Sequence, residues 1–75
     1  MGTSGKKALT AREQEIVGLL AEGMGTEAIR RRLAISRVTV RNHVQRILAK
    51  LGAHSRLEAL ARARRKGLLR DSDGP

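Results

Sequence analysis

Three neighbouring side chains, Arg41, Asn42 and Gln45, have the chemistry to bind the edges of DNA bases. In the major groove, arginine can form two hydrogen bonds to guanine, and asparagine or glutamine can form two to adenine. If the segment is helical, positions i, i+1 and i+4 share one outward arc. Polar residues on a helix are usually only its solvated face, so base binding requires that other elements position this helix.

The surrounding segment, Ser36–Leu51, has the pattern of a helix with two different faces. Its apolar residues recur at helical spacing and predict a buried stripe. The stripe consists of Val40, Val44, Ile47, Leu48 and Leu51. Arg37 and Val38 lie on the other side, with the candidate base contacts. Ser36 can cap the helix start, and Gly52 can end it in a left-handed conformation. Such a helix is typical of a recognition helix.

Two shorter helices are predicted before this segment. The first begins at Thr10-Ala-Arg-Glu13, a capping box, with Leu9 in front of it as a hydrophobic staple, and ends at Gly23. Its buried face is expected to consist of Ile16, Val17, Leu19 and Leu20. The second helix is short and spans about Thr26–Leu33.

The second helix turns Ile29 and Leu33 to the core, one turn apart. Its charge run, Arg30–Arg32, has two interpretations, either a solvated face or contacts to DNA phosphates beside the groove. A short turn then leads to Ser36, where the long helix opens. Two helices joined by so short a turn predict a helix-turn-helix.

A fourth helix is predicted from the capping box at Ser55–Glu58 to a stop at Gly67. The residues expected to close the core are Ala59, Leu60 and Ala63. Leu57, Ala61 and Arg64 lie on a neighbouring face. Leu57 belongs either to the core or to a small self-complementary patch for a two-fold dimer.

Composition limits the function classes. The chain has 75 residues, enough for one small domain without a deep substrate pocket. Its net charge of +9 favours a polyanionic partner, with nucleic acid first and an anionic membrane surface second. It contains no cysteine, which excludes disulfides and thiolate chemistry, and no aromatic residue, which argues against modules that stack single-stranded bases.

The predicted organisation is a flexible N-terminal tail at residues 1–8, one domain at 9–69 and a disordered C-terminal tail at 70–75. No signal segment or membrane span is visible. His43 and His54 stand alone, without cysteines or clustered carboxylates to complete a metal site. We therefore expect no enzyme activity, no metal and no cofactor.

Many residues agree in order and spacing with the LuxR-type (GerE) DNA-binding domain of bacterial transcription regulators, which the chain resembles over about 9–69. The matching residues are Leu9-Thr10-Ala-Arg-Glu13, Ile29, Leu33, Ile35-Ser36, Thr39-Val40-Arg41, His43, Ile47, Lys50-Leu51-Gly52, Ser55-Arg56, Glu58-Ala59 and Gly67-Leu68. The resemblance implies an all-α, four-helix bundle-like domain containing a helix-turn-helix. It also implies a bacterial, cytoplasmic protein bound to the nucleoid, with a receiver or ligand-sensing domain absent from this chain.

The resemblance also implies site residues. The third helix would enter the major groove with Arg41, Asn42 and Gln45 at base edges. The resemblance places Thr39 and Lys50 at DNA phosphates, and the basic residues Arg37 and Arg31 are predicted as further backbone contacts. The predicted dimer interface is Leu57, Ala61 and Arg64 of the fourth helix. Two positions depart from the family pattern, because Gly25 and Ala28 replace the usual capping box of the second helix. Arg30 also stands where the family prefers a small alanine.

The sequence therefore predicts sequence-specific binding to double-stranded DNA, by a dimer on inverted repeats whose interface is weak without DNA. One alternative is a promoter-recognising or polymerase-contacting module of the sigma-factor type, which would not need the fourth helix with its own caps. Another is a membrane binder built from basic amphipathic helices. The absence of Trp and Phe anchors counts against the membrane binder.

Overall fold

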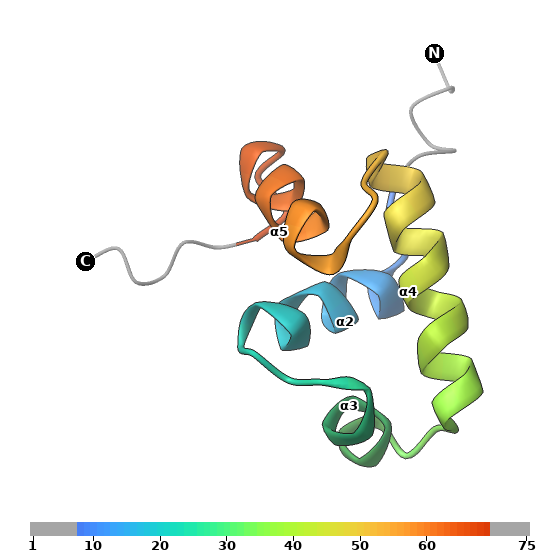
Figure 1. Cartoon of the computed structure of the whole chain (residues 1–75). Coiled ribbons are helices and arrows are strands. Elements are labelled where there is room, and N and C mark those ends of the chain that lie inside the picture. Colours follow the sequence, from blue (N-terminus) through green and yellow to red (C-terminus); the bar gives the residue numbers. More distant parts are fainter. Residues whose placement is uncertain (1–7, 70–75) are drawn as a thin grey trace.

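The computed structural model describes residues 8–69, and this part of the chain is all-α (Figure 1). Its helices are α2 (Ala11–Ala21), α3 (Thr26–Leu33), α4 (Arg37–Leu51) and α5 (Arg56–Arg65). The predicted all-α class and the four predicted helices are confirmed. The predicted tails fall almost wholly on residues 1–7 and 70–75, which lie outside the described part.

Helix α2 begins with the predicted capping box. The Glu13 amide donates to the Thr10 hydroxyl at 3.1 Å, and the Thr10 amide donates to the Glu13 carboxylate at 2.9 Å. Leu9 is buried directly before the cap. Gly23 ends the helix with φ of +88°, a left-handed conformation that favours glycine.

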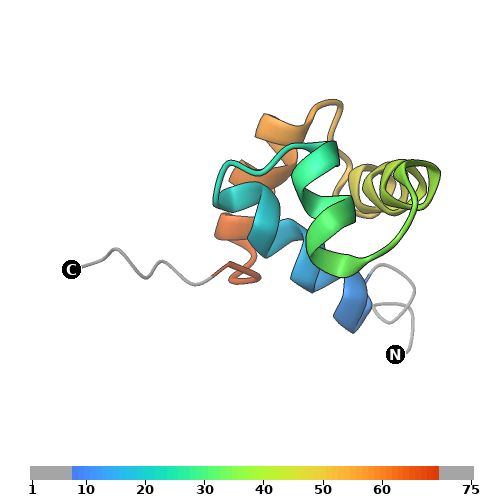
Figure 2. The same cartoon turned by 90° about the horizontal axis from the view of Figure 1, so that it is seen from below.

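Helices α3 and α4 form the predicted helix-turn-helix. Gly25 caps α3 without a side-chain hydrogen bond, as expected from the missing capping box. Ala34 ends α3 in the left-handed region, with φ of 58°, and the Ile35 amide then donates to the Arg30 carbonyl at 3.0 Å. Ser36 opens α4 by accepting the Thr39 amide at 3.0 Å. In Figure 2 α4 is seen nearly end-on beside α3.

The start of α5 differs in part from the prediction. The Ser55 hydroxyl accepts the Glu58 amide at 3.1 Å, which is the first half of a capping box. The Glu58 carboxylate, however, accepts the His54 amide at 2.7 Å and not the Ser55 amide, so the predicted reciprocal bond is wrong by one residue. The helix ends beside Gly67, where the Leu68 amide donates to the Ala63 carbonyl at 2.8 Å.

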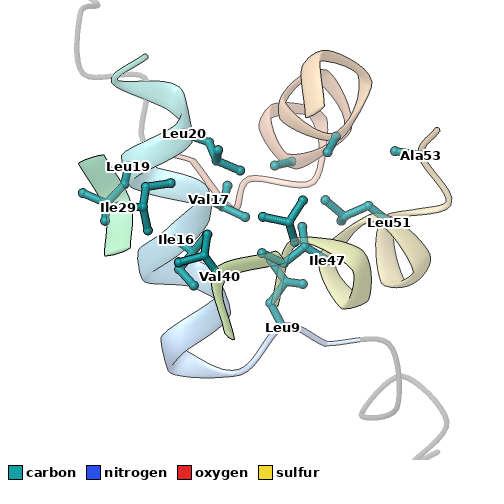
Figure 3. Packing of buried hydrophobic residues seen from close by; sticks show 13 residues of the cluster. Leu9, Ile16, Val17, Leu19, Leu20, Ile29, Val40, Ile47, Leu51 and Ala53 are labelled. Carbon is teal, nitrogen blue, oxygen red and sulfur yellow. The ribbon is translucent and has the colours of Figure 1, made fainter. Parts of the chain in front are cut away.

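One apolar core joins the helices, with α4 in contact with each of the other three (Figure 3). The buried apolar residues are Leu9, Ile16, Val17, Leu19, Leu20, Ile29, Val40, Val44, Ile47, Leu51, Ala53, Ala59 and Ala63. These include the predicted stripe of α4 except Leu48, which is half-buried. Leu57 is 78% exposed, so the alternative that assigned it to the core is wrong. No described helix has the length and apolar character needed to cross a membrane.

Candidate nucleic-acid interface

The side of α4 that faces away from the core forms one continuous exposed face. It consists of Arg37, Val38, Arg41, Asn42, Gln45, Arg46 and Ala49. The periodicity explains this face, because the buried residues Val40, Val44, Ile47 and Leu51 fill the opposite side of the helix. The structure thus brings the predicted base contacts, Arg41, Asn42 and Gln45, together on one surface.

Arg46 belongs to this exposed face and was missed in the sequence analysis. It follows Asn42 by four residues, which is one helical turn, so helical spacing alone could have found it. Neither Arg41 nor Arg46 forms an ion pair with another residue of the described chain. Both guanidinium groups therefore keep all their donors available for an external acceptor.

The predicted phosphate contacts Arg31 and Arg37 share one carboxylate, that of Glu27. Arg37 Nη2 lies 3.0 Å from Glu27 Oε1, and Arg31 Nε lies 3.7 Å from Glu27 Oε2. Arg30 bonds the same carboxylate, with Nη2 2.7 Å from Oε2. The ion pair between Glu27 and Arg37 therefore links α3 to the first residue of α4 across the turn. The Arg30 and Arg37 bonds hold the pKa of Glu27 below its ordinary value, and Glu27 raises the pKa of Arg30.

This cluster accounts for Arg30, which departs from the family pattern. Its side chain is only partly exposed and bonds Glu27 within α3, so the helix forms over the predicted residues without a small side chain there. In the arginine run, Arg31 and Arg32 are exposed, whereas Arg30 is half-buried. Three arginines around one carboxylate leave net positive charge beside the N-terminus of α4, where anions are favoured.

Lys50 has a different environment from the other predicted phosphate contacts. Its Nζ lies 2.7 Å from Glu13 Oε1 and 3.2 Å from the Ala8 carbonyl oxygen. The Lys50 side chain is 23% exposed and Glu13 is 2% exposed. Burial by itself raises the pKa of Glu13, but the bonds from Lys50 and Thr10 outweigh it and hold that pKa below its ordinary value.

Thr39, the remaining predicted phosphate contact, is half-buried in the first turn of α4. Its hydroxyl lies 2.8 Å from the Ser36 hydroxyl, and either group can donate. Because Ser36 also accepts the Thr39 amide, the two hydroxyls fix the helix start in place. A hydroxyl with one such partner keeps further acceptor capacity.

The predicted dimer residues lie together on α5. Leu57, Ala61 and Arg64 are all exposed, and their spacing of four and then three residues places them on one side of the helix. Leu57 and Val38 are the exposed large apolar side chains of the described chain. The α5 face is therefore available to a partner, although it is small.

The histidines do not form a metal site. His43 is half-buried, and its Nδ1 has no hydrogen-bond partner among the described residues, while His54 is exposed. Within residues 8–69 no three His, Cys, Asp or Glu side chains are grouped to hold a metal ion.

A helix-turn-helix whose second helix exposes a polar face defines a class of domain, and comparison with known proteins identifies the family. The family described as bacterial regulatory proteins, luxR family, matches residues 7–63. This match covers more than half of the chain, so the chain belongs to that family. The regulator reading is thereby favoured over the sigma-factor-like alternative.

Two relatives and two solved structures illustrate the similarity. The chain is 44% identical over 59 residues to the transcriptional regulatory protein DesR of Bacillus subtilis, covering 79% of this chain and 30% of DesR. It is 43% identical over 61 residues to the probable transcriptional regulatory protein NarL of Mycobacterium tuberculosis, covering 81% of this chain and 28% of NarL. The chain thus spans less than a third of these relatives.

Among solved structures, the transcription factor GerE superimposes with a TM-score of 0.78 at 42% identity, covering 83% of this chain and 92% of GerE. The response regulator ChrA of a heme-sensing two-component system gives a TM-score of 0.80 at 39% identity, covering 81% of this chain and 30% of ChrA. The predicted fold is confirmed, and the family of regulators confirms the prediction that the chain is not an enzyme.

Proposed function

We propose that this chain is the DNA-binding output domain of a bacterial transcription regulator and that α4 enters the major groove. The observation that supports this most directly is the exposed face of α4, which gathers Arg41, Asn42 and Gln45 on a helix anchored by its opposite side. These side chains match the hydrogen-bonding patterns of guanine and adenine. The charge of +9 supplies the attraction to the duplex.

Backbone contacts would fix the position of α4 in the groove. Arg37 and Arg31 stand at its N-terminal end, next to α3, and Thr39 adds a hydroxyl to the same turn. Lys50 lies at the other end of α4 and would bind a phosphate with the ammonium donor that Glu13 and the Ala8 carbonyl leave free. Contacts at both ends of a recognition helix orient it without sequence preference.

A dimer on an inverted repeat is the second part of the proposal. One recognition helix contacts only a few base pairs, whereas two related by a two-fold axis would occupy successive major grooves, roughly 34 Å apart. The exposed residues Leu57, Ala61 and Arg64 of α5 would form the contact. The patch is small, so the contact would be weak without DNA.

The complete protein is proposed to contain a further domain. The chain spans 30% of DesR and 30% of ChrA, which is a response regulator. We propose that the complete protein also contains a receiver or ligand-sensing domain that is absent from this chain, that the DNA-binding domain occupies residues 9–69, and that the protein acts on the nucleoid in the bacterial cytoplasm.

The test begins with selection of bound sites from random duplex DNA at a stated salt concentration. On the selected site, Gln45→Ala or Asn42→Ala is expected to cost about 1–3 kcal/mol and to relax the preference at one base pair. Gln14→Ala is a matched control, because Gln14 is exposed on α2. If the substitutions instead lowered the affinity for every duplex equally, Gln45 and Asn42 would be backbone contacts, and their assignment as base contacts would be wrong.

A further inference from the structure

Val38 is an exposed apolar side chain that neither the core nor the α5 face explains. It is 63% exposed in the first turn of α4, although the neighbouring Val40 is fully buried. A single exposed apolar residue needs no explanation by itself. Val38, however, lies within the exposed face of α4, among side chains proposed to contact bases.

The geometry of α4 places Val38 at the end of the helix that recognition helices direct at base edges. Arg41, Asn42 and Gln45 follow it by three, four and seven residues, so all four side chains lie on the same side. Val38 therefore adds an apolar side chain to this side of α4, one turn closer to the N-terminus than Arg41 and Asn42.

The first turn of α4 is held firmly, which fixes the direction of the Val38 side chain. Ser36 bonds both the amide and the hydroxyl of Thr39, and Glu27 bonds Arg37. A valine in a helix also adopts mainly one side-chain rotamer. Val38 is therefore a rigid apolar group that loses little conformational freedom when it is covered.

The major groove exposes one apolar group on its base edges, the C5 methyl of thymine. Valine has no hydrogen-bonding atom, so it can distinguish bases only through such a contact or through steric exclusion. We infer that Val38 packs against the C5 methyl of a thymine and thereby sets the preference at one base pair beside those contacted by Arg41 and Asn42. This inference rests on the proposed function of α4.

The decisive experiment removes the methyl group and nothing else. Each thymine of the selected half-site is replaced in turn by deoxyuridine, which keeps the base pair and its other major-groove groups. We expect one replacement to weaken binding of the unaltered protein about fourfold, as removal of one buried methyl from a contact would. Val38→Ala should bind the thymine and deoxyuridine sites nearly equally.

A second comparison uses the same methyl on a different base. Cytosine and 5-methylcytosine are placed at the position found in this way, and the unaltered protein should prefer the methylated base, whereas Val38→Ala should not. Circular dichroism melting provides the folding control, because an exposed Val38 should be replaceable without change in helicity or melting temperature. Val38→Thr, which keeps one methyl, should retain part of the preference.

The inference is overturned if no thymine of the half-site responds to loss of its methyl. It is also overturned if Val38→Ala responds as strongly as the unaltered protein. In both cases, if Gln45→Ala still changes the base preference, the proposed function of α4 is retained and only the inference about Val38 is wrong. A protein that selects no preferred duplex at all would instead contradict the proposed function, and the inference with it.

Discussion

The ammonium of Lys50 lies 2.7 Å from Oε1 of Glu13, and this ion pair joins the last turn of α4 to the first turn of α2. The same oxygen accepts the Thr10 amide, so one carboxylate atom serves both the helix cap and the ion pair. Because Glu13 is buried, its charge depends on Lys50 for compensation. Lys50 therefore stabilises the fold in addition to its proposed contact with DNA.

We expect Lys50→Met to destabilise the domain by about 2 kcal/mol, because the Glu13 carboxylate would stay buried without its cation. This value lies below the range of about 3–5 kcal/mol for fully buried pairs, since Lys50 is partly exposed. Methionine keeps the aliphatic packing, so the loss reports mainly on charge. Urea unfolding measures the change in the free energy of unfolding.

The matched control for this prediction is the double variant Lys50→Met with Glu13→Gln. Removing both charges leaves no uncompensated ion, so the two substitutions should cost clearly less than the sum of their separate effects. If the change in the free energy of unfolding of the double variant equals the sum of the two single changes, the interaction between Lys50 and Glu13 contributes nothing to stability.

The acidic groups predict how stability depends on pH. The pKa values of Glu13, Glu27 and Glu58 all lie below their ordinary values, Glu58 because it accepts the His54 amide and bonds Arg62. A carboxyl whose pKa is lowered by folding stabilises the native state above the pKa of the unfolded chain. This stabilisation is lost as the pH falls through the lowered values of the folded state.

We therefore expect the free energy of unfolding to decline once the pH falls to about 4.5, the ordinary value for these groups, and to keep declining below it. Urea titrations at a series of pH values measure this. Glu27→Gln should show a shallower decline, because one of the groups with a lowered pKa is gone. An equally steep decline in that variant would exclude Glu27 as a contributor.

Arg31 gives the clearest test of the backbone contacts. Its side chain is strongly exposed, and its ion pair with Glu27, at 3.7 Å, is the longest in the cluster, so Arg31→Ala should leave the fold intact. Losing one phosphate contact should weaken every duplex similarly and reduce the slope of log affinity against log salt by about 0.9. Titrations at several salt concentrations measure that slope.

The control removes the same charge elsewhere. Arg65 is exposed in the last turn of α5, and this end of α5 lies away from α4 in both views (Figures 1 and 2). Arg65→Ala should therefore leave the salt slope on a single half-site almost unchanged. If both variants changed the slope equally, net charge rather than a defined contact would explain the binding.

Ala34 offers a stabilising substitution in the turn before α4. Its φ of 58° is a left-handed conformation that costs an alanine roughly 1–2 kcal/mol, whereas asparagine tolerates it better. Ala34→Asn should raise stability by about 1 kcal/mol, which corresponds to roughly 4–8 °C in melting temperature. Ala49→Asn, at an exposed helical position, should instead lower the melting temperature. A lower melting temperature for Ala34→Asn would contradict this reasoning.

The helices were predictable because their signals are local. Each cap, at Thr10, Ser36 and Ser55, joins a side chain to the amide three residues later, so it can be recognised from a few adjacent residues. Apolar periodicity likewise identifies the buried side of each helix. The candidate base contacts follow from the same periodicity, since the buried stripe of α4 dictates what remains outside. The left-handed turn at Ala34 has no such signal, because alanine does not mark that conformation.

The two ion pairs between helices, Glu13–Lys50 and Glu27–Arg37, were not predictable, because they join residues that only the fold brings together. Glu13 and Lys50 are 37 residues apart in sequence, and Glu27 and Arg37 are 10 apart on different helices. Nor could spacing decide between the two interpretations of Leu57. Its exposure is fixed by how α5 rests on α2 and α4, which turns Ala59 and Ala63 inward.

The exposure of Leu57 allows a clean test of the proposed dimer. Because its side chain is 78% exposed, Leu57→Asp should preserve helicity and melting temperature. The free domain is expected to be mostly monomeric, since alanine adds little contact area and the Arg64 side chains of two copies repel. Sedimentation should show a monomer with or without the substitution.

On DNA the same variant should behave differently from the unaltered protein. Its affinity for a single half-site should be nearly unchanged, but cooperative binding to the inverted repeat should be lost, because a two-fold contact would bring together two patches that each carry a buried aspartate in place of leucine. Inserting about 5 base pairs between the half-sites should abolish cooperativity of the unaltered protein in the same way, since it turns the two sites to opposite faces of the duplex. Gln14→Asp supplies the same charge on α2 and should leave cooperativity intact. A folded Leu57→Asp variant that still binds both half-sites cooperatively would show that the α5 face is the wrong surface.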